Sequence, residues 1–232
     1  MEIKHNLVLL FEDIKTNQKD GASTLAKKTL LKLKSIISET RDKTIIPEII
    51  NIAKSVRPSM PIIKNIVSKL EGLPSEKIQD HIDILIKNLE AKKKKIADMG
   101  EIILSQFQNI GVVSFSSNIN HILSKKQRKN LFALRSDNYA KMFGENVNFV
   151  DDWEIENKVE IGIMGADAIV VSDTKTYIVN GYPSENFVKS IKRKSILVFA
   201  ESEKIVLQNL YSIEEQNLQL FEMKENIHLI IV

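Results

Sequence analysis

The spacing of apolar side chains divides the chain into two parts of different period. Up to about residue 107, apolar residues recur every three or four positions with charged residues between them, as on one face of a helix. These stripes run over residues 3–14, 26–37, 49–56, 62–70 and 78–103. Asp20-Gly21 and the proline-bounded corner Arg57–Pro61 interrupt them. The pattern predicts an all-helical domain over residues 1–107.

From residue 108 the apolar residues form short, β-branched runs instead. The runs cover residues 110–114, 130–134, 147–150, 159–163, 168–171, 176–179, 195–199 and 227–232. Helical spacing returns between them near residues 119–123 and 185–192. Such alternation is typical of a mostly parallel sheet covered on both faces by helices. The sequence therefore predicts an α/β fold class, with a Rossmann-like domain over residues 108–232 after the helical domain.

One predicted strand runs into a turn that presents a carboxylate. In Ile161–Val171 an apolar strand meets Gly165 and Ala166, presents Asp167, and returns as a second strand. Small residues leave space beside the carboxylate, and ligands of open parallel sheets bind at the carboxyl ends of strands. An aspartate between strands is also a common turn former. From the local residues alone, both interpretations of Asp167 stay open.

Other polar residues follow the predicted strands and complete a candidate ligand site. They are Ser116, Ser117, Arg135, Asn180 and Gly181. Serine hydroxyls and backbone N–H groups at a strand-to-helix turn can hold a phosphate, and an arginine can clamp it with two hydrogen bonds. Helix capping explains Ser116 and Ser117 equally well, and Arg135 could instead form a surface salt bridge.

Composition narrows the classes of function. Hydrophobic residues make up 43% of the chain and charged residues 27%, which fits a globular protein, and the net charge of +3 demands no polyanionic partner. The absence of cysteine excludes disulfides and thiolate chemistry. The four histidines lack metal-ligand spacing, and Gly162–Gly165 is not a dinucleotide fingerprint. We expect neither a metal nor a cofactor.

The sequence also carries signals about location and nucleic acids. It begins without the basic and then apolar residues of a signal peptide, and no apolar run approaches the ~20 residues that span a membrane, so we expect a cytoplasmic protein.

Lysine-rich runs occur at Lys92–Lys95, Lys125–Lys129 and Lys192–Lys194. Such runs are usually solvated helix faces. No aromatic residues interleave them for base stacking, so nucleic-acid binding ranks last among the functions considered.

Taken together, these motifs resemble the family of translation initiation factor 2B regulatory subunits (alpha, beta and delta). Its enzyme relatives are ribose-1,5-bisphosphate isomerase and methylthioribose-1-phosphate isomerase. The resemblance is carried by Gly165–Ile169 with Asn180, and by Ala200–Lys204, which is similar to the family's Ala-Glu-Ser-x-Lys. Gly21–Thr24, Arg57–Met60 and Ser114–Ser117 are weaker matches in the same order. The resemblance implies a helical domain before a Rossmann-like one, in agreement with the periodicity.

Departures from the family pattern bear on catalysis. Ser116 stands where the isomerases carry a catalytic cysteine, and a serine needs a base beside it. Asp167 matches the family aspartate. The family's Asn-Lys-x-Gly-Thr is replaced by Asn180–Ser184. Arg135-Ser136 lies where the family often has an arginine followed by a proline. Loss of the cysteine, the lysine and the glycine-threonine step argues against sugar-phosphate isomerisation.

The leading interpretation is a non-catalytic protein that resembles these subunits and acts in assembly or regulation. The resemblance implies a homodimer or larger assembly through the α/β domain, with translation initiation factor 2 or related subunits as partners. The apolar residues between Ile205 and Phe221 would supply the interface. The alternative is an aldose–ketose isomerase on a phosphorylated pentose, with Asp167 moving protons and Arg135 holding phosphate. A sensor that binds a phosphorylated sugar or nucleotide without chemistry lies between them.

Overall fold

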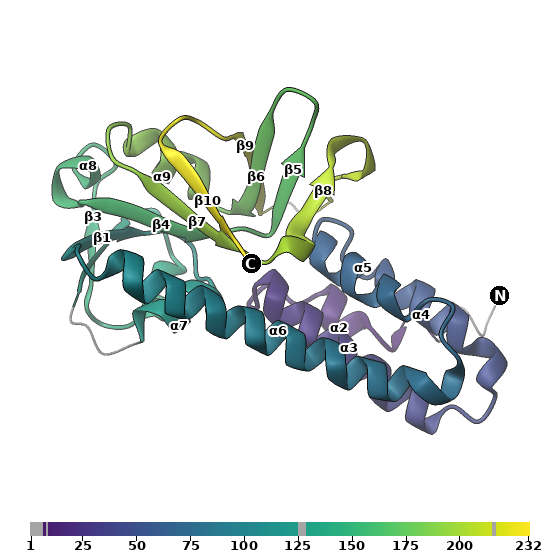
Figure 1. Cartoon of the computed structure of the whole chain (residues 1–232). Coiled ribbons are helices and arrows are strands. Elements are labelled where there is room, and N and C mark those ends of the chain that lie inside the picture. The colour runs from purple at the N-terminus through teal and green to yellow at the C-terminus, as the bar shows by residue number, and fades with distance from the viewer. Residues whose placement is uncertain (1–6, 8, 125–128, 215–216) are drawn as a thin grey trace.

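A computed structural model describes residues 7, 9–124, 129–214 and 217–232. Figure 1 shows a helical part that leads into a part built on strands. The helices are α2 (Glu12–Lys15), α3 (Ala22–Glu39), α4 (Ile46–Lys54), α5 (Pro61–Val67), α6 (Ser75–Leu104), α7 (Ser117–Leu123), α8 (Ile155–Lys158) and α9 (Ser184–Ser190). Short 3-10 helices are η1 (Lys43–Ile45), η2 (Ser68–Leu70), η3 (Ala140–Phe143), η4 (Ser202–Lys204) and η5 (Gln208–Leu210).

The helical part forms where the apolar stripes predicted it. Leu25, Leu30 and Leu33 of α3 are fully buried in one core that also contains Ile62 of α5 and Ile82 of α6. Both α4 and α5 carry a proline in the first turn. A proline is tolerated there because the first N–H groups of a helix have no partner within it. The part of the expected first helix over residues 1–6 and 8 lies outside the described residues.

The strands build two sheets. They are β1 (Asn109–Val112), β2 (Asn130–Leu134), β3 (Val147–Val150), β4 (Ile161–Gly165), β5 (Ala168–Val171), β6 (Thr176–Gly181), β7 (Ile196–Ala200), β8 (Ile205–Leu207), β9 (Leu218–Glu222) and β10 (Ile227–Ile231). The first sheet has the order β10-β7-β4-β1-β2-β3, and every pair in it is parallel. The predicted order of helices followed by an α/β part with a parallel sheet is confirmed.

The second sheet was not anticipated from the sequence. Its order is β8-β5-β6-β9, and β6 pairs antiparallel with both of its neighbours. The short connection from Val171 to Thr176 closes β5 and β6 as a hairpin. Because a parallel pair needs a long crossover, so short a connection cannot return β6 parallel to β5. The chain passes from the first sheet to the second between the end of β4 at Gly165 and the start of β5 at Ala168.

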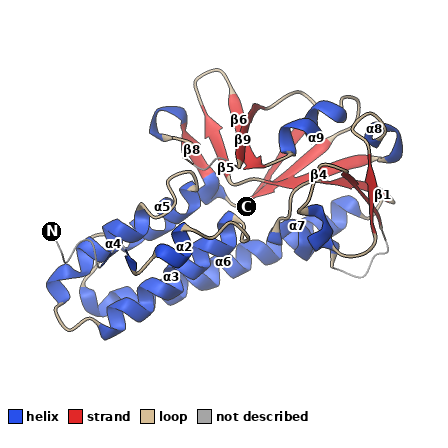
Figure 2. Ribbon diagram, turned by 180° about the vertical axis from the view of Figure 1, so that it is seen from behind, coloured by secondary structure: helices blue, strands red, loops and turns tan. Residues whose placement is uncertain are grey.

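Helices cover both faces of the parallel sheet, as Figure 2 shows from behind. On one face, Ile119 and Ile122 of α7 share a core with the end of α6 and the sheet. On the other face, Phe187 of α9 belongs to a core with residues of both sheets. A Cβ at Gly111 or Gly162 would lie 3.1–3.2 Å from the Phe187 ring, so these glycines let the ring approach the strands closely.

Helix α6 takes part in both the helical and the sheet cores. Its residues from Ile78 to Leu89 are buried in the helical core, whereas Ile96, Ala97 and Leu104 are buried against the sheet. The change of core therefore falls inside α6. A division into domains at residue 107 stays a prediction.

Glu203 ties the helical part to the α/β part. Its carboxylate accepts from Lys69 of η2 at 3.1 Å and from Lys92 of α6 at 2.7 Å. Asn65 of α5 donates to the backbone carbonyl of Glu203 at 2.8 Å. Lys92 is thus a bridging residue, although the sequence analysis placed it on a solvated face. Within the described residues, no helix combines the length and apolarity that crossing a membrane requires.

A tight contact between α6 and α7 gives a test of this packing. A Cβ at Gly100 would lie 2.6–2.8 Å from three side-chain carbons of Ile122. We expect Gly100→Ala to lower the free energy of unfolding by about 1–2 kcal/mol, because overpacking outweighs the gain in helix propensity. In an Ile122→Ala background the same change should be neutral or stabilising, because the colliding carbons are gone. Urea denaturation of the four proteins measures this cycle, and an equal loss in both backgrounds would contradict the contact.

Candidate functional site

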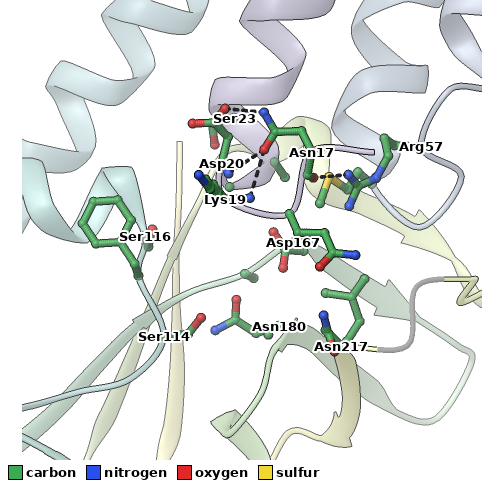
Figure 3. A pocket seen from close by; sticks show the side chains of 18 of the residues that line it. Asn17, Lys19, Asp20, Ser23, Arg57, Ser114, Ser116, Asp167, Asn180 and Asn217 are labelled. Atoms are coloured by element: carbon green, nitrogen blue, oxygen red, sulfur yellow. Dashed lines mark hydrogen bonds between the residues drawn. The ribbon is translucent and has the colours of Figure 1, made fainter. Parts of the chain in front are cut away.

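A cavity of about 400 Å³ lies between the helical part and the carboxyl ends of strands. The helical part contributes the connection from α2 to α3 and the corner before α5; the α/β part contributes the ends of β1, β4 and β6. Its lining includes Asn17, Asp20, Gly21, Ser23, Arg57, Met60, Ser114, Ser116, Ser117, Tyr139, Asp167, Asn180, Gly181, Lys204 and Asn217. In Figure 3, Asn17, Asp20, Ser23 and Arg57 lie on one side, with Ser114 and Asn180 opposite. The size suits a small molecule.

The loop after β1 is held in place by Asp137. Ser114 adopts a left-handed backbone conformation with φ of 49°, and its N–H donates to Asp137 Oδ2 at 2.6 Å. Asp137 Oδ1 accepts from the backbone N–H groups of Tyr139 and Ala140 at 3.0 Å each. Burial raises the pKa of Asp137, although these three donors favour its ionised form. Asp137 therefore joins two loops that border the cavity, a role that the sequence analysis missed.

Ser116 packs against the end of β4. A Cβ at Gly165 would lie 2.6 Å from Ser116 Oγ, so only glycine leaves space for that side chain. The next turn places Asp167 on the same cavity, where its backbone N–H donates to Val179 O at 2.8 Å. Among the described residues that line the cavity there is no histidine. An imidazole base of the kind that activates a serine nucleophile is thus missing from this lining.

Asn180 and its neighbours form a satisfied polar group at the end of β6. Asn180 Nδ2 donates to Ser184 Oγ at 2.9 Å, and Ser184 Oγ donates to Gly181 O at 2.6 Å. A Cβ at Gly181 would lie 3.0 Å from Ser114 Oγ. The end of β6 therefore lies tightly against the loop after β1, and its amide is fixed in one orientation.

The opposite wall is organised by Asn17 and Arg57. Asn17 Oδ1 accepts from the backbone N–H groups of Lys19 and Asp20 at 3.0 Å, and its Nδ2 donates to Asp20 Oδ2 at 2.8 Å. Arg57 is only 6% exposed and donates to the carbonyls of Lys15 and Asn17. The guanidinium thus fixes the connection between α2 and α3 and places a positive charge at the cavity.

A buried ion pair lies beneath the cavity. Lys204 Nζ is 3.0 Å from Glu201 Oε2, and both side chains are almost fully buried. Asn118 Nδ2 donates to Glu201 Oε1 at 3.0 Å. Burial alone would raise the pKa of Glu201, but the charge of Lys204 and hydrogen bonds from Asn118 and Ser23 hold it at about 2. The pair connects the end of β7 to α7 and α3.

The structure gathers most of the residues that the sequence analysis proposed. Ser116, Ser117, Asp167, Asn180 and Gly181 all line the cavity. Arg135 does not: it is exposed and forms an ion pair with Asp151 at 3.1 Å. The cations that do line it include Arg57 and Lys204, which occur in two of the motifs that carry the resemblance but were given no role. Those motifs could have identified them.

Comparison with solved structures reveals a shared fold. The chain is similar to the Pyrococcus horikoshii OT3 translation initiation factor eIF-2B, with a TM-score of 0.75 and 18% identity, over 93% of this chain and 90% of that one. It is similar to a chain of the tetrameric eIF2B-beta2-delta2 complex from C. thermophilum, with a TM-score of 0.68 and 14% identity, over 93% of this chain and 85% of that one. It is also similar to a 5-methylthioribose 1-phosphate isomerase from Pyrococcus horikoshii OT3, with a TM-score of 0.62 and 14% identity, over 87% of this chain and 68% of that one.

These similarities confirm the predicted resemblance at the level of fold. No protein-family model and no curated protein sequence matches the chain. The structures that share its fold include both initiation-factor subunits and an isomerase. The shared fold alone does not choose between the functions of these proteins.

The buried ion pair predicts a specific pH dependence of stability. Because the folded pKa of Glu201 is about 2 and the ordinary value is 4.5, its contribution is present above pH 4.5 and is lost as pH falls toward 2. The difference corresponds to about 3 kcal/mol. Glu201→Gln should remove this dependence and destabilise the protein by about 3–5 kcal/mol at neutral pH, because Lys204 stays buried without its partner.

Denaturation between pH 2 and 7 measures both effects. Glu90→Gln is the matched control, because the Glu90–Lys27 ion pair has two exposed side chains and its loss should change little. An unchanged pH slope in Glu201→Gln would show that the ion pair does not govern acid stability.

Proposed function

We propose that this chain is a non-catalytic subunit of an oligomeric regulatory assembly, whose cavity binds a phosphorylated small molecule. The observation that carries the proposal is an exposed apolar segment on the second sheet. The fold shared with a subunit of a tetrameric complex supports it. Translation initiation factor 2 or a related subunit is the partner that the resemblance implies.

The apolar segment, here named the β8 edge, consists of Ile205, Leu207, Leu210 and Ile213. Their exposed fractions are 39%, 57%, 61% and 40%. β8 is the end strand of its sheet, and at its start the Ile205 carbonyl accepts from Asn65 Nδ2 of α5 at 3.3 Å. Large apolar residues exposed at an end strand favour association over a monomeric surface. Of the stretch that the sequence analysis singled out, Phe221 is instead buried in the protein's own core.

The cavity has the groups for binding a phosphate. Ser117 supplies a hydroxyl, and Arg57 supplies charge. Gly21, the N-cap of α3, lines the cavity and offers no side-chain cap. The first N–H groups of this long helix can therefore meet an anion. Asp20 faces the same space, and its ion pair with Lys28 at 2.5 Å offsets its charge.

Oligomerisation is tested by light scattering at low and high salt. We expect an assembly at micromolar concentration that persists at high salt, because an apolar interface is not screened. Leu207→Glu with Leu210→Glu should weaken it by about tenfold or more for each residue. Ile84→Glu with Ile102→Glu on α6 is the control, because both side chains are 50% or more exposed away from the β8 edge. A monomer in both buffers would refute the assembly proposal.

An isomerase is the second candidate, because Ser116, Asp167 and Asn180 meet at one cavity. A serine hydroxyl is much harder to ionise than the thiol it replaces. We therefore expect the purified protein not to convert ribose 1,5-bisphosphate or methylthioribose 1-phosphate to the ketose in a coupled assay. Turnover that Asp167→Asn abolishes would establish the isomerase and exclude the non-catalytic proposal.

A further inference from the structure

A second cavity, of about 440 Å³, lies between α3, α6 and α7. Here it is named the lysine cavity, and its lining is Ser23, Thr24, Lys27, Leu89, Glu90, Lys93, Lys94, Ser117, His121 and Glu201. It adjoins the first cavity, because Ser23 and Ser117 line both. Thr24 Oγ1 donates to Ser117 Oγ at 3.3 Å across this boundary. The lysine run and three of the motifs contribute residues to it, although the sequence analysis did not predict a site here.

Helix geometry brings its charged residues together. Leu89 and Lys93, like Glu90 and Lys94, are four residues apart on α6 and so lie on one helical face. Ser117 and His121 have the same spacing on α7. The lysine run of α6 is therefore divided: Lys92 bonds Glu203, whereas Lys93 and Lys94 face the lysine cavity. A run that looks uniform in sequence has distinct roles.

The lysine cavity has an excess of positive charge. Its two carboxylates are each neutralised, Glu90 by Lys27 at 2.5 Å and Glu201 by Lys204 at 3.0 Å. Within the described part of the chain, neither Lys93 nor Lys94 forms an ion pair. Two lysine charges therefore remain, and the Ser117 hydroxyl, which accepts from Thr24, lines the same cavity. Lysine ammonium groups and hydroxyls both bind phosphate oxygens.

The lining also limits what kind of anion fits. The volume is in the range of small-molecule sites and below what a folded partner would need. Phe, Tyr and Trp are absent from the described residues that line it, so the imidazole of His121 is the one ring there on which a nucleobase could stack. We propose that the lysine cavity is a binding site for a compact polyanion of the phosphate class, with Lys93 and Lys94 as its ligands. This inference does not depend on the proposed assembly or on the first cavity being occupied.

Calorimetric titration with inorganic pyrophosphate at fixed ionic strength tests the inference. We expect saturable binding to the full chain, and about a tenfold or greater rise in Kd for Lys93→Ala with Lys94→Ala. Lys87→Ala with Lys95→Ala is the matched control. It removes the same charge from exposed positions of the same helix that do not line the lysine cavity, and it should leave Kd nearly unchanged. Lys93→Arg with Lys94→Arg should retain binding, because the charges remain.

Two results would overturn the inference. The first is no saturable binding to the unmodified chain. The second is an equal rise in Kd for the two double-alanine variants, which would show that binding depends only on the net charge of the surface. Circular dichroism melting of every variant separates lost binding from lost folding. Light scattering on the same samples reports the assembly separately, so failure of this site and failure of the proposed function are distinguishable.

Discussion

The buried ion pair between Glu201 and Lys204 is the constraint on which the two cavities depend. Removing two charges from water is costly, and their attraction offsets that cost only with good geometry and further hydrogen bonds. Asn118 and Ser23 supply those bonds from α7 and α3. Glu201 lines the lysine cavity and Lys204 lines the first cavity, so one pair fixes the floor of both. The pair also positions three elements relative to one another.

The same short segment also sets the orientation of the helical part. Glu203 is two residues from Glu201 and accepts from Lys69 and Lys92, which are partly exposed, so these bonds contribute modestly. The Asn65 side chain adds a hydrogen bond to the backbone carbonyl of Glu203, so the acceptor of this bond is part of the backbone. The distance between the two walls of the first cavity thus follows from residues after β7. A ligand between those walls would contact both parts and stabilise their relative position.

Periodicity predicted the elements better than their partners. Helices and parallel strands were predictable because burial imposes a period on sequence. β5 and β6 have buried apolar residues like the strands of the parallel sheet, so their runs could not reveal that they form a second one. β8 and β9 are largely exposed and therefore showed weak patterns. Asp167 and Ser116 were predicted to line a site because both follow the carboxyl ends of predicted strands, where ligands of parallel sheets bind. Arg135 follows the same rule, but a strand end does not determine side-chain direction, and its guanidinium turns to Asp151.

What the sequence could not supply was the state of each polar group, which bears on whether the site binds a ligand or converts it. A proton-transfer catalyst needs a carboxyl whose pKa lies near the working pH. Glu201 has a pKa of about 2, and Asp137 is occupied by three backbone N–H groups. Asn180 is committed to Ser184. Hydrogen bonds hold Asp137 and Asn180 in place, while burial raises the pKa of the Asp137 carboxyl. A lining that its own hydrogen bonds hold in place loses little entropy when a ligand binds, which favours binding at this cavity.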